Sequence, residues 1–422
     1  MKRIVVLGAG FAGLWSAIGA ARKLDELGVT RDGIEVVVVN KTAFHSIRVR
    51  NYEEQLQDTI VPLSEVLDPV GVRWIEGDVA NIDVDAKTIV IDTGSGQKSL
   101  AFDRLVFAMG SRLARPSIKG LSAYAFDVDT YDGARRLEAH LADLPSLKAP
   151  GRYTALVIGA GLTGVEIAAE LPGRLRELTG ERGSGEVRVI LADRAPRIAH
   201  EMGEAQPVIV EALNALGVEM MPSFQLREID AQGAVLDTGE RIFASTIIWC
   251  GGMQAHPMTG AFAVTHDRLG RLPVDSYLRV SGASDVFAAG DAASLLIDGR
   301  HETVMSCQHG RPMGRFAGHN VVCDLLGLDM LPLRIDWYST VLDLGPWGAV
   351  YTFGWDRKLV AQGMAAKRVK QLINRQRIYP PRTGRKDDLF AAAKPAVDDP
   401  PKFPGVGHGD VAKAEQVAAG PQ

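Results

Sequence analysis

The sequence contains the dinucleotide-binding fingerprint Gly-x-Gly-x-x-Gly twice, at Gly8–Gly13 and at Gly159–Gly164. Each copy follows a short apolar segment that predicts a strand, Ile4–Leu7 and Ala155–Ile158, and precedes a helix-like run. In this context the first glycine makes a tight turn, the second lets backbone amides approach a pyrophosphate, and the third permits close helix–strand packing. The pyrophosphate would lie at a helix N-terminus, which favours anions. The pattern therefore predicts two dinucleotides held in one chain.

Composition places the chain among ordinary globular proteins. Its 422 residues are 46% hydrophobic and 23% charged, enough for two or three domains. The net charge of -4 gives no reason to expect a nucleic-acid partner. No run of about 18 uncharged apolar residues predicts a membrane span, and the first predicted strand begins too early for a targeting segment. These features predict a cytoplasmic protein.

The order of predicted elements indicates an α/β fold with two Rossmann-like domains, one inserted in the other. We expect the outer domain to comprise residues 1–118 and 268–330, and the inserted domain residues 119–267. A C-terminal α+β piece would cover residues 331–384. The tail, residues 385–422, is rich in Ala, Pro, Gly and Asp without periodicity, which predicts disorder.

The residue after the second strand of each unit bears on the choice of nucleotide. Asp193 would accept hydrogen bonds from a ribose 2′-OH and repel a 2′-phosphate, which favours NADH over NADPH. The nearby Arg194 and Arg197 weaken that preference, and a turn or helix cap is the alternative role for Asp193. The first unit has Asn40 at this place, whose amide can also bind a ribose hydroxyl. Lys41 would approach the pyrophosphate or remain solvated.

Several further motifs resemble known flavoproteins. Asp285–Ala293 resembles the second FAD signature of the two-dinucleotide flavoprotein reductases, and Leu105–Ser111 resembles the strand that closes over the FAD. Glu76–Val79 resembles the segment whose backbone holds the adenine. Within that superfamily, Gly164–Leu171 and Asp343–Tyr351 resemble type II NADH dehydrogenases. The resemblance covers residues 1 to about 380.

This resemblance implies FAD in the outer domain and NADH in the inserted domain. The residues implied for FAD are Gly8, Gly10, Phe11, Ala12, Gly13, Asn40, Lys41, Val79, Ala108, Gly110, Gly290, Asp291 and Gln308. Those implied for NADH are Gly161, Thr163, Gly164, Glu166 and Asp193. No metal site is expected, because the three cysteines are too widely spaced for one.

The resemblance also suggests catalytic residues and an acceptor. Glu166 would position the nicotinamide or relay a proton, unless it forms only a surface salt bridge. The family's stretch Ala-Gln-x-Ala-x-Gln-Gln-Gly lines its quinone pocket, and Cys307–Gly314 keeps only the first glutamine and the last glycine. Gln308 would bind the flavin or a quinone carbonyl, and His309 would donate a proton to the reduced acceptor. Alternatively, both residues only cap the helix.

Thiol chemistry is disfavoured because no cysteine precedes Cys250, so a redox CxxxxC pair is absent. A distant pair of Cys250 and Cys307 is conceivable, but Cys250 ends an apolar strand and is better interpreted as a buried thiol. The segment His45–Tyr52 brings two arginines that would bind the pyrophosphate, the acceptor or structural carboxylates.

We therefore expect an NADH oxidoreductase that reduces a quinone-like or other small acceptor. The alternatives are a reductase of ferredoxin or rubredoxin, and a slow NADH-responsive redox sensor. Residues 366–376 show an apolar face with a basic rim, which fits peripheral contact with the inner face of the cell membrane or packing on the protein itself. A homodimer is also conceivable.

Overall fold

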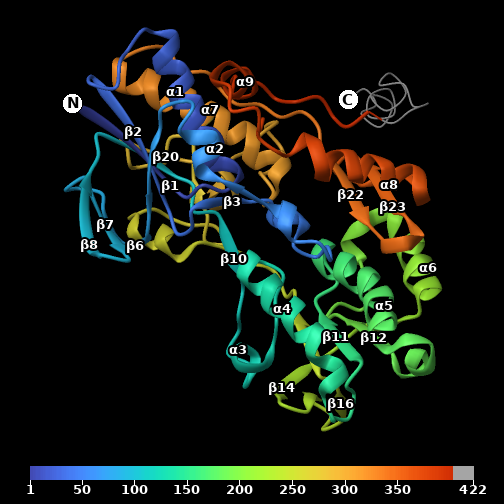
Figure 1. The fold of residues 1–422 in the computed structure, drawn as a ribbon. Coiled ribbons are helices and arrows are strands. Elements are labelled where there is room, and N and C mark those ends of the chain that lie inside the picture. The colour runs from blue at the N-terminus through green and yellow to red at the C-terminus, as the bar shows by residue number, and fades with distance from the viewer. Residues whose placement is uncertain (403–422) are drawn as a thin grey trace.

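The computed structural model describes residues 1–402. For residues 181–184 it describes the backbone alone. Figure 1 shows two lobes, one around β1, β2, α1 and α7 and one around β11, β12 and α5, with the C-terminal strands beside α5. Residues 403–422 of the predicted tail lie outside the described part of the chain.

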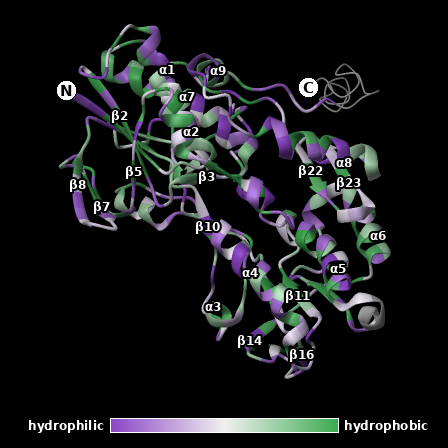
Figure 2. Cartoon of the chain, viewed as in Figure 1, coloured by the Kyte–Doolittle hydropathy of each residue, from purple (hydrophilic) through white to green (hydrophobic). Residues whose placement is uncertain are grey.

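The first lobe is built on a five-stranded parallel sheet of order β20-β9-β1-β2-β5. Its strands in chain order are β1 (Lys2–Leu7), β2 (Ile34–Asn40), β5 (Arg73–Glu76), β9 (Arg104–Phe107) and β20 (Val286–Ala288). The edge strand β5 has the sequence Arg-Trp-Ile-Glu and is partly exposed. The central strands β1, β2 and β9 are covered on both faces and are therefore largely continuous apolar runs rather than alternating ones. These central strands show mainly the hydrophobic colour in Figure 2. The last strand comes from far downstream, so this sheet closes only after the chain returns to it.

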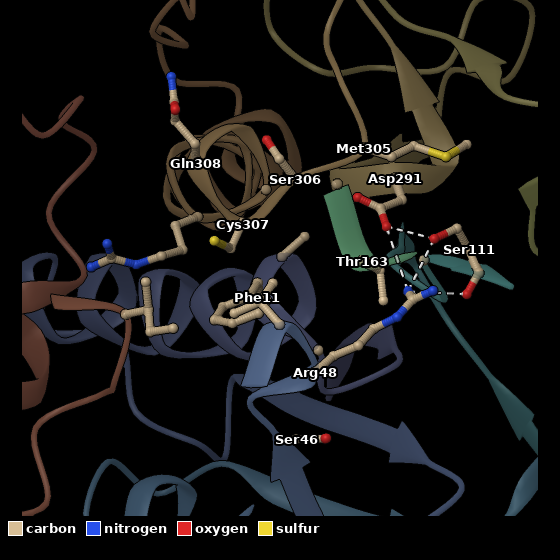
Figure 3. Close-up of a pocket in the computed structure, with 18 of the residues that line it drawn as sticks. Phe11, Ser46, Arg48, Ser111, Thr163, Asp291, Met305, Ser306, Cys307 and Gln308 are labelled. Carbon is tan, nitrogen blue, oxygen red and sulfur yellow. Dashed lines mark hydrogen bonds and ion pairs between the residues drawn. The ribbon is translucent and has the colours of Figure 1, made fainter. Parts of the chain in front are cut away.

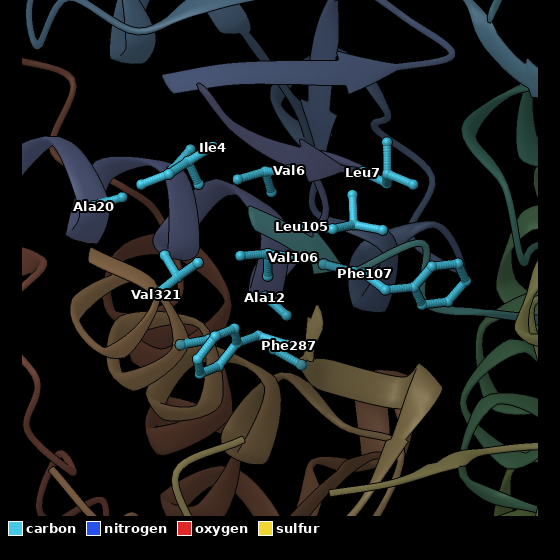
Figure 4. Packing of buried hydrophobic residues seen from close by; sticks show 14 of the residues in the cluster. Ile4, Val6, Leu7, Ala12, Ala20, Leu105, Val106, Phe107, Phe287 and Val321 are labelled. Carbon is cyan, nitrogen blue, oxygen red and sulfur yellow. The ribbon is translucent and has the colours of Figure 1, made fainter. Parts of the chain in front are cut away.

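Helices α1 (Phe11–Glu26) and α7 (Cys307–Leu326) lie against each other over this sheet, and their contact is the most extensive one between two elements of the fold. Figure 4 shows Val321 of α7 and Phe287 of β20 packed close to Ile4 and Val106. Glycine makes this approach possible: a Cβ at Gly318 would lie 2.2 Å from the backbone oxygen of Ser16 on α1.

The second lobe contains a four-stranded parallel sheet of order β13-β12-β11-β17. The strands are β11 (Thr154–Ile158), β12 (Arg188–Ala192), β13 (Val218–Met221) and β17 (Thr246–Trp249), and helices α5 (Leu162–Gly183) and α6 (Gln206–Leu216) pack on them. Every residue of the central strand β11 and of the edge strand β17 is buried, as expected for a parallel sheet that is covered on both faces.

Two short strands join the lobes. β10 (Ser111–Leu113) leaves the first sheet and pairs antiparallel with β18 (Met253–Ala255), which brings the chain back. The second parallel sheet therefore lies between the outgoing and returning strands.

Antiparallel strands and short helices complete the two lobes. The strands are β3 (Phe44–Ser46), β4 (Ile60–Pro62), β6 (Asp78–Asp83), β7 (Thr88–Thr93), β8 (Gly96–Ala101), β14 (Leu226–Asp230), β15 (Gly233–Leu236) and β16 (Arg241–Phe243), with the parallel pair β19 (Leu272–Pro273) and β21 (Ala293–Ser294). The helices are α2 (Leu63–Leu67), α3 (Leu121–Tyr124) and α4 (Tyr131–Asp143).

The C-terminal piece is an antiparallel sheet followed by helices. Its strands are β22 (Ser339–Asp343), β23 (Ala349–Phe353) and β24 (Lys358–Gln362), and α8 (Gly363–Leu372) packs on them. A π-helical turn, Ile373–Arg377, extends α8.

The prediction of a disordered tail from Arg385 is wrong for residues 385–402. Helix α9 (Lys386–Ala392) packs against α1, and Leu389 and Ala393 are fully buried. The average composition of the tail hid this short apolar face, because only a few apolar side chains stand among Asp, Pro and Lys residues.

Replacement of Gly318 by alanine tests the α1–α7 contact. We expect Gly318→Ala to lower the free energy of unfolding by about 1–3 kcal/mol, because the added methyl group would overlap the α1 backbone. The matched control is Gly173→Ala on α5, where a Cβ meets no atom within 4 Å and alanine should raise helix stability by up to about 1 kcal/mol. Urea unfolding of both variants measures the difference, and equal midpoints would contradict the packing described.

Candidate active site

A cavity of about 770 Å³ lies where the two lobes and the C-terminal piece meet. Its walls include the first fingerprint, the end of β20, the start of α7, the start of α5 and parts of α8 and β22. Figure 3 shows Phe11, Thr163, Cys307 and Asp291 around this space, although they belong to segments far apart in the sequence.

Many of the predicted cofactor residues line this cavity: Gly10, Phe11, Ala12, Asn40, Lys41, Ala108, Gly110, Thr163, Glu166, Gly290, Asp291 and Gln308. The other predicted residues lie outside its lining: Gly8, Gly13, Val79, Gly161, Gly164 and Asp193. The structure therefore gathers ten of the thirteen residues predicted for FAD together with two of the five predicted for NADH.

The fingerprint glycines fit the approach of a dinucleotide. A Cβ at Gly10 or at Gly161 would meet no atom within 4 Å, so the backbone at the second glycine of each copy faces open space. A Cβ at the third glycine would overlap the backbone instead. A Cβ on Gly13 would lie 1.9 Å from the Gly8 carbonyl oxygen, and a Cβ on Gly164 would lie 1.7 Å from the Gly159 carbonyl oxygen. A pyrophosphate-binding turn requires both features: free space at the second glycine for the phosphate, and close helix–strand packing at the third.

Asn40 and Asp193 make equivalent contacts in the two units. The Asn40 side-chain oxygen accepts a hydrogen bond from the Ala9 N–H at 2.8 Å, and one Asp193 oxygen accepts from the Ala160 N–H at 2.6 Å. Asp193 also accepts from the Ala195 N–H at 2.7 Å, so it caps the turn after its strand. Both side chains thus brace the loop of their own fingerprint, and their contacts with ribose remain predictions.

Arg48 contributes to the site although the sequence only indicated its segment. Figure 3 shows its guanidinium directed at Asp291 and Ser111. Ser111 Oγ donates to Asp291 at 2.6 Å, and Arg48 lies 3.6 Å from the same carboxylate and also pairs with Asp129. This network holds the Asp291 carboxylate at the cavity wall, next to the end of β20. The cluster of two arginines after β2 was the available signal.

Glu166 forms a buried ion pair across two parts of the fold. Its carboxylate accepts from Lys370 Nζ on α8 at 2.7 Å and from the Asp343 N–H at 3.1 Å. Both charged side chains are buried and line the cavity. Burial raises the pKa of Glu166, and the Lys370 ammonium opposes that rise. The alternative of a surface salt bridge is therefore wrong.

At the start of α7, the neighbouring residues Gln308 and His309 have different surroundings. Gln308 lines the cavity and its amide donates to the Trp337 carbonyl at 3.4 Å. His309 is fully buried outside the lining, and its Nδ1 accepts from the Val304 N–H at 2.9 Å. Burial lowers the pKa of His309 to about 4, so the ring is neutral at neutral pH. The expectation that His309 protonates an acceptor is wrong, and the residue braces the helix start instead.

The cysteines do not form a reactive pair at the cavity. Burial raises the pKa of the Cys250 thiol to about 12, and it raises the pKa of Cys307 as well. Cys307 lines the cavity, whereas Cys250 lies outside its lining. A thiolate is the reactive form of cysteine, so these burial effects oppose thiol chemistry.

Of the basic side chains expected to form a rim on the C-terminal helix, the two lysines make ion pairs inside the protein, whereas Arg368 and Arg375 stay exposed. Lys370 pairs with Glu166 and Lys367 pairs with Asp343. The exposed face keeps two apolar side chains, Met364 and Leu372, which are 54% and 52% exposed. No helix within residues 1–402 is long and apolar enough to span a bilayer.

Known proteins with similar sequences and folds carry related functions. A family model for pyridine nucleotide-disulphide oxidoreductases matches residues 2–314. An NADH dehydrogenase-like protein of Mycobacterium tuberculosis is 51% identical over 406 residues, which are 95% of this chain and 100% of that protein. A type II NADH:quinone oxidoreductase of Staphylococcus saprophyticus is 26% identical over 400 residues, or 90% and 95% of the two chains. The structure of NDH2 from Plasmodium falciparum in complex with NADH has a TM-score of 0.74 at 12% identity, covering 93% and 97%.

The two fingerprints, the two parallel sheets and the shared cavity define a two-dinucleotide oxidoreductase. The chain belongs to the pyridine nucleotide-disulphide oxidoreductase family. Its cofactors are FAD and NADH, and the cavity residues fit that assignment. The resemblance to type II NADH dehydrogenases is confirmed, while the redox disulphide in the family's name has no counterpart among the three cysteines.

The buried neutral state of His309 predicts a pH effect on stability. A histidine in the unfolded chain has a pKa of about 6.5, and burial lowers that of His309 to about 4. Between these values the unfolded state binds more protons, so stability falls as the pH decreases through this range. His309→Asn keeps an acceptor for the Val304 N–H and should make the loss of stability between pH 7 and pH 5 smaller. Urea midpoints at both pH values measure it, with the exposed His200→Asn as control; an unchanged pH dependence in His309→Asn would contradict the buried neutral ring.

Proposed function

We propose that this enzyme oxidises NADH and passes the electrons through FAD to a quinone-like acceptor. One observation carries the proposal: a single cavity is lined by residues of the FAD fingerprint, the NADH unit and the start of α7. The relative from Staphylococcus saprophyticus is named a type II NADH:quinone oxidoreductase, which supports the same acceptor class. Bound FAD supplies the hydride-accepting and electron-transferring chemistry, so the protein itself contributes geometry and electrostatics.

The NADH side of the cavity is formed by the start of α5. Leu162, Thr163 and Glu166 line it there, because residues at the N-terminal turn of this helix face the gap between the lobes. The Glu166 carboxylate is held by Lys370, so it offers a fixed acceptor to the nicotinamide amide. In this role Glu166 positions the nicotinamide. Asp193, after β12 of the same unit, favours the free ribose 2′-OH of NADH over the 2′-phosphate of NADPH.

The acceptor side is formed by the start of α7 and the C-terminal piece. Gln308 presents a side-chain amide to the cavity, and Tyr338 and Ile378 lie in the same wall. Tyr338 stacks on Trp355, which lies outside the lining, with ring centroids 4.7 Å apart, so this stacking fixes the one aromatic ring that Tyr338 contributes to the wall. A planar quinone is compatible with an aromatic wall and one hydrogen-bonding amide, and Gln308 would bind its carbonyl.

A steady-state acceptor assay tests this function. FAD-loaded enzyme should oxidise NADH rapidly with menadione or short-chain ubiquinone as acceptor, because each can accept a pair of electrons in the cavity. Ferredoxin and rubredoxin serve as one-electron protein acceptors in parallel reactions. Reduction of a protein acceptor with neither quinone reduced would refute the quinone assignment, and slow turnover with every acceptor would favour a redox sensor.

A further inference from the structure

Two arginines of α7 lie buried beside the acceptor part of the cavity. Arg311 and Arg315 stand one helical turn apart, and both guanidinium groups lie over the ring of Trp15, at 5.6 Å and 4.9 Å from its centroid. Their side chains are only 10% and 5% exposed. Two like charges in a buried place require an anion nearby, because burial without pairing is costly.

The anion in this structure belongs to the C-terminal segment. Asp398 follows α9, and its carboxylate bridges the two arginines, at 3.2 Å from Arg311 and 2.9 Å from Arg315. The Asp398 side chain is 37% exposed, so the carboxylate reaches the arginines from the solvent side. Asp398 and its neighbour Val397 also line the cavity. The chain itself thus shows that a carboxylate fits between these two guanidinium groups.

The pairing leaves donors of Arg311 unused. Burial lowers the pKa of Arg311 to about 10, Arg315 adds to this effect, and Asp398 opposes it. The Nε atoms of Arg311 and Arg315 are buried and have no hydrogen-bond partner among residues 1–402. A guanidinium has five N–H donors in a planar fork that suits a carboxylate. Arg311 lines the cavity, so an anion there can pair with the guanidinium in place of Asp398.

Helix geometry links this arginine to the predicted acceptor residue. Arg311 lies three positions after Gln308, and residues at this spacing share one face of a helix. Both side chains line the cavity from α7. A planar acceptor that contacts the Gln308 amide would therefore have the Arg311 guanidinium about one helical turn, roughly 5 Å, further along the same wall.

We infer that Arg311 and Arg315 form an anion subsite at the acceptor end of the cavity. The Asp398 carboxylate occupies this subsite in the resting protein, and an acceptor with its own carboxylate or comparable acidic group displaces it. The inference rests on the proposed function for the identity of the ligand as an electron acceptor. It adds that this enzyme prefers acidic aromatic acceptors over neutral ones.

Binding of an anion that cannot be reduced tests the subsite itself. Oxidised holoenzyme is titrated with 2-naphthoate, and its flavin absorbance and Trp fluorescence report binding. Arg311→Gln should weaken 2-naphthoate binding by about tenfold or more, the usual effect of losing a charged hydrogen bond. Asp398→Asn should tighten it several-fold, because the internal competitor loses its charge. The exposed Asp399→Asn and Arg268→Gln are matched controls and should leave binding within about twofold.

Turnover then tests the link to the acceptor. The KM for a sulfonated naphthoquinone should rise about tenfold in Arg311→Gln, whereas the KM for neutral menadione should stay within about twofold. If Arg311→Gln fails to fold, the Asp398→Asn titration decides the question alone.

The outcomes separate the two proposals. Unchanged 2-naphthoate binding in Asp398→Asn would overturn the subsite and leave the ion pairs as an anchor of the tail. An equal change in KM for the sulfonated naphthoquinone and for menadione in Arg311→Gln would overturn the preference for acidic acceptors. The predicted 2-naphthoate binding without reduction of any quinone would support the subsite and refute the proposed function.

Discussion

The buried ion pair between Glu166 and Lys370 holds the cavity together. It joins α5, which follows the second fingerprint, to α8 of the C-terminal piece, and it does so at the wall of the cavity. Removing one member of a buried pair leaves an uncompensated charge, which typically costs about 3–5 kcal/mol. The position of the C-terminal sheet relative to the NADH unit therefore depends on this contact, and so does the shape of the space between them.

Near that ion pair, the carboxyl ends of strands from both parallel sheets lie at the same cavity. Ligands of open α/β sheets bind beyond the carboxyl ends of the strands, and here the ends of β1 and β9 lead into Gly10 and Ala108 at the cavity. The inserted unit presents Thr163 and Glu166 to the same space. One cavity between two nucleotide units is what direct electron transfer between two bound cofactors requires.

Local patterns predicted much of the fold. Strand–turn–helix units with glycine fingerprints are visible within short windows, so β1 with α1 and β11 with α5 could be placed. The partner of Glu166 could not, because Lys370 is 204 positions away and its register carries no local signal. The burial of His309 and the packing of Leu389 were missed for the same reason. Both depend on tertiary neighbours that composition averages conceal.

Anaerobic stopped-flow mixing of FAD-loaded enzyme with NADH tests the central claim most directly. If the two nucleotides share this cavity, the visible absorbance of oxidised flavin should bleach within seconds. Chemical reduction with dithionite in a parallel sample shows the full amplitude that the bound flavin can give. No bleaching by NADH within seconds, with full bleaching by dithionite, would contradict the account.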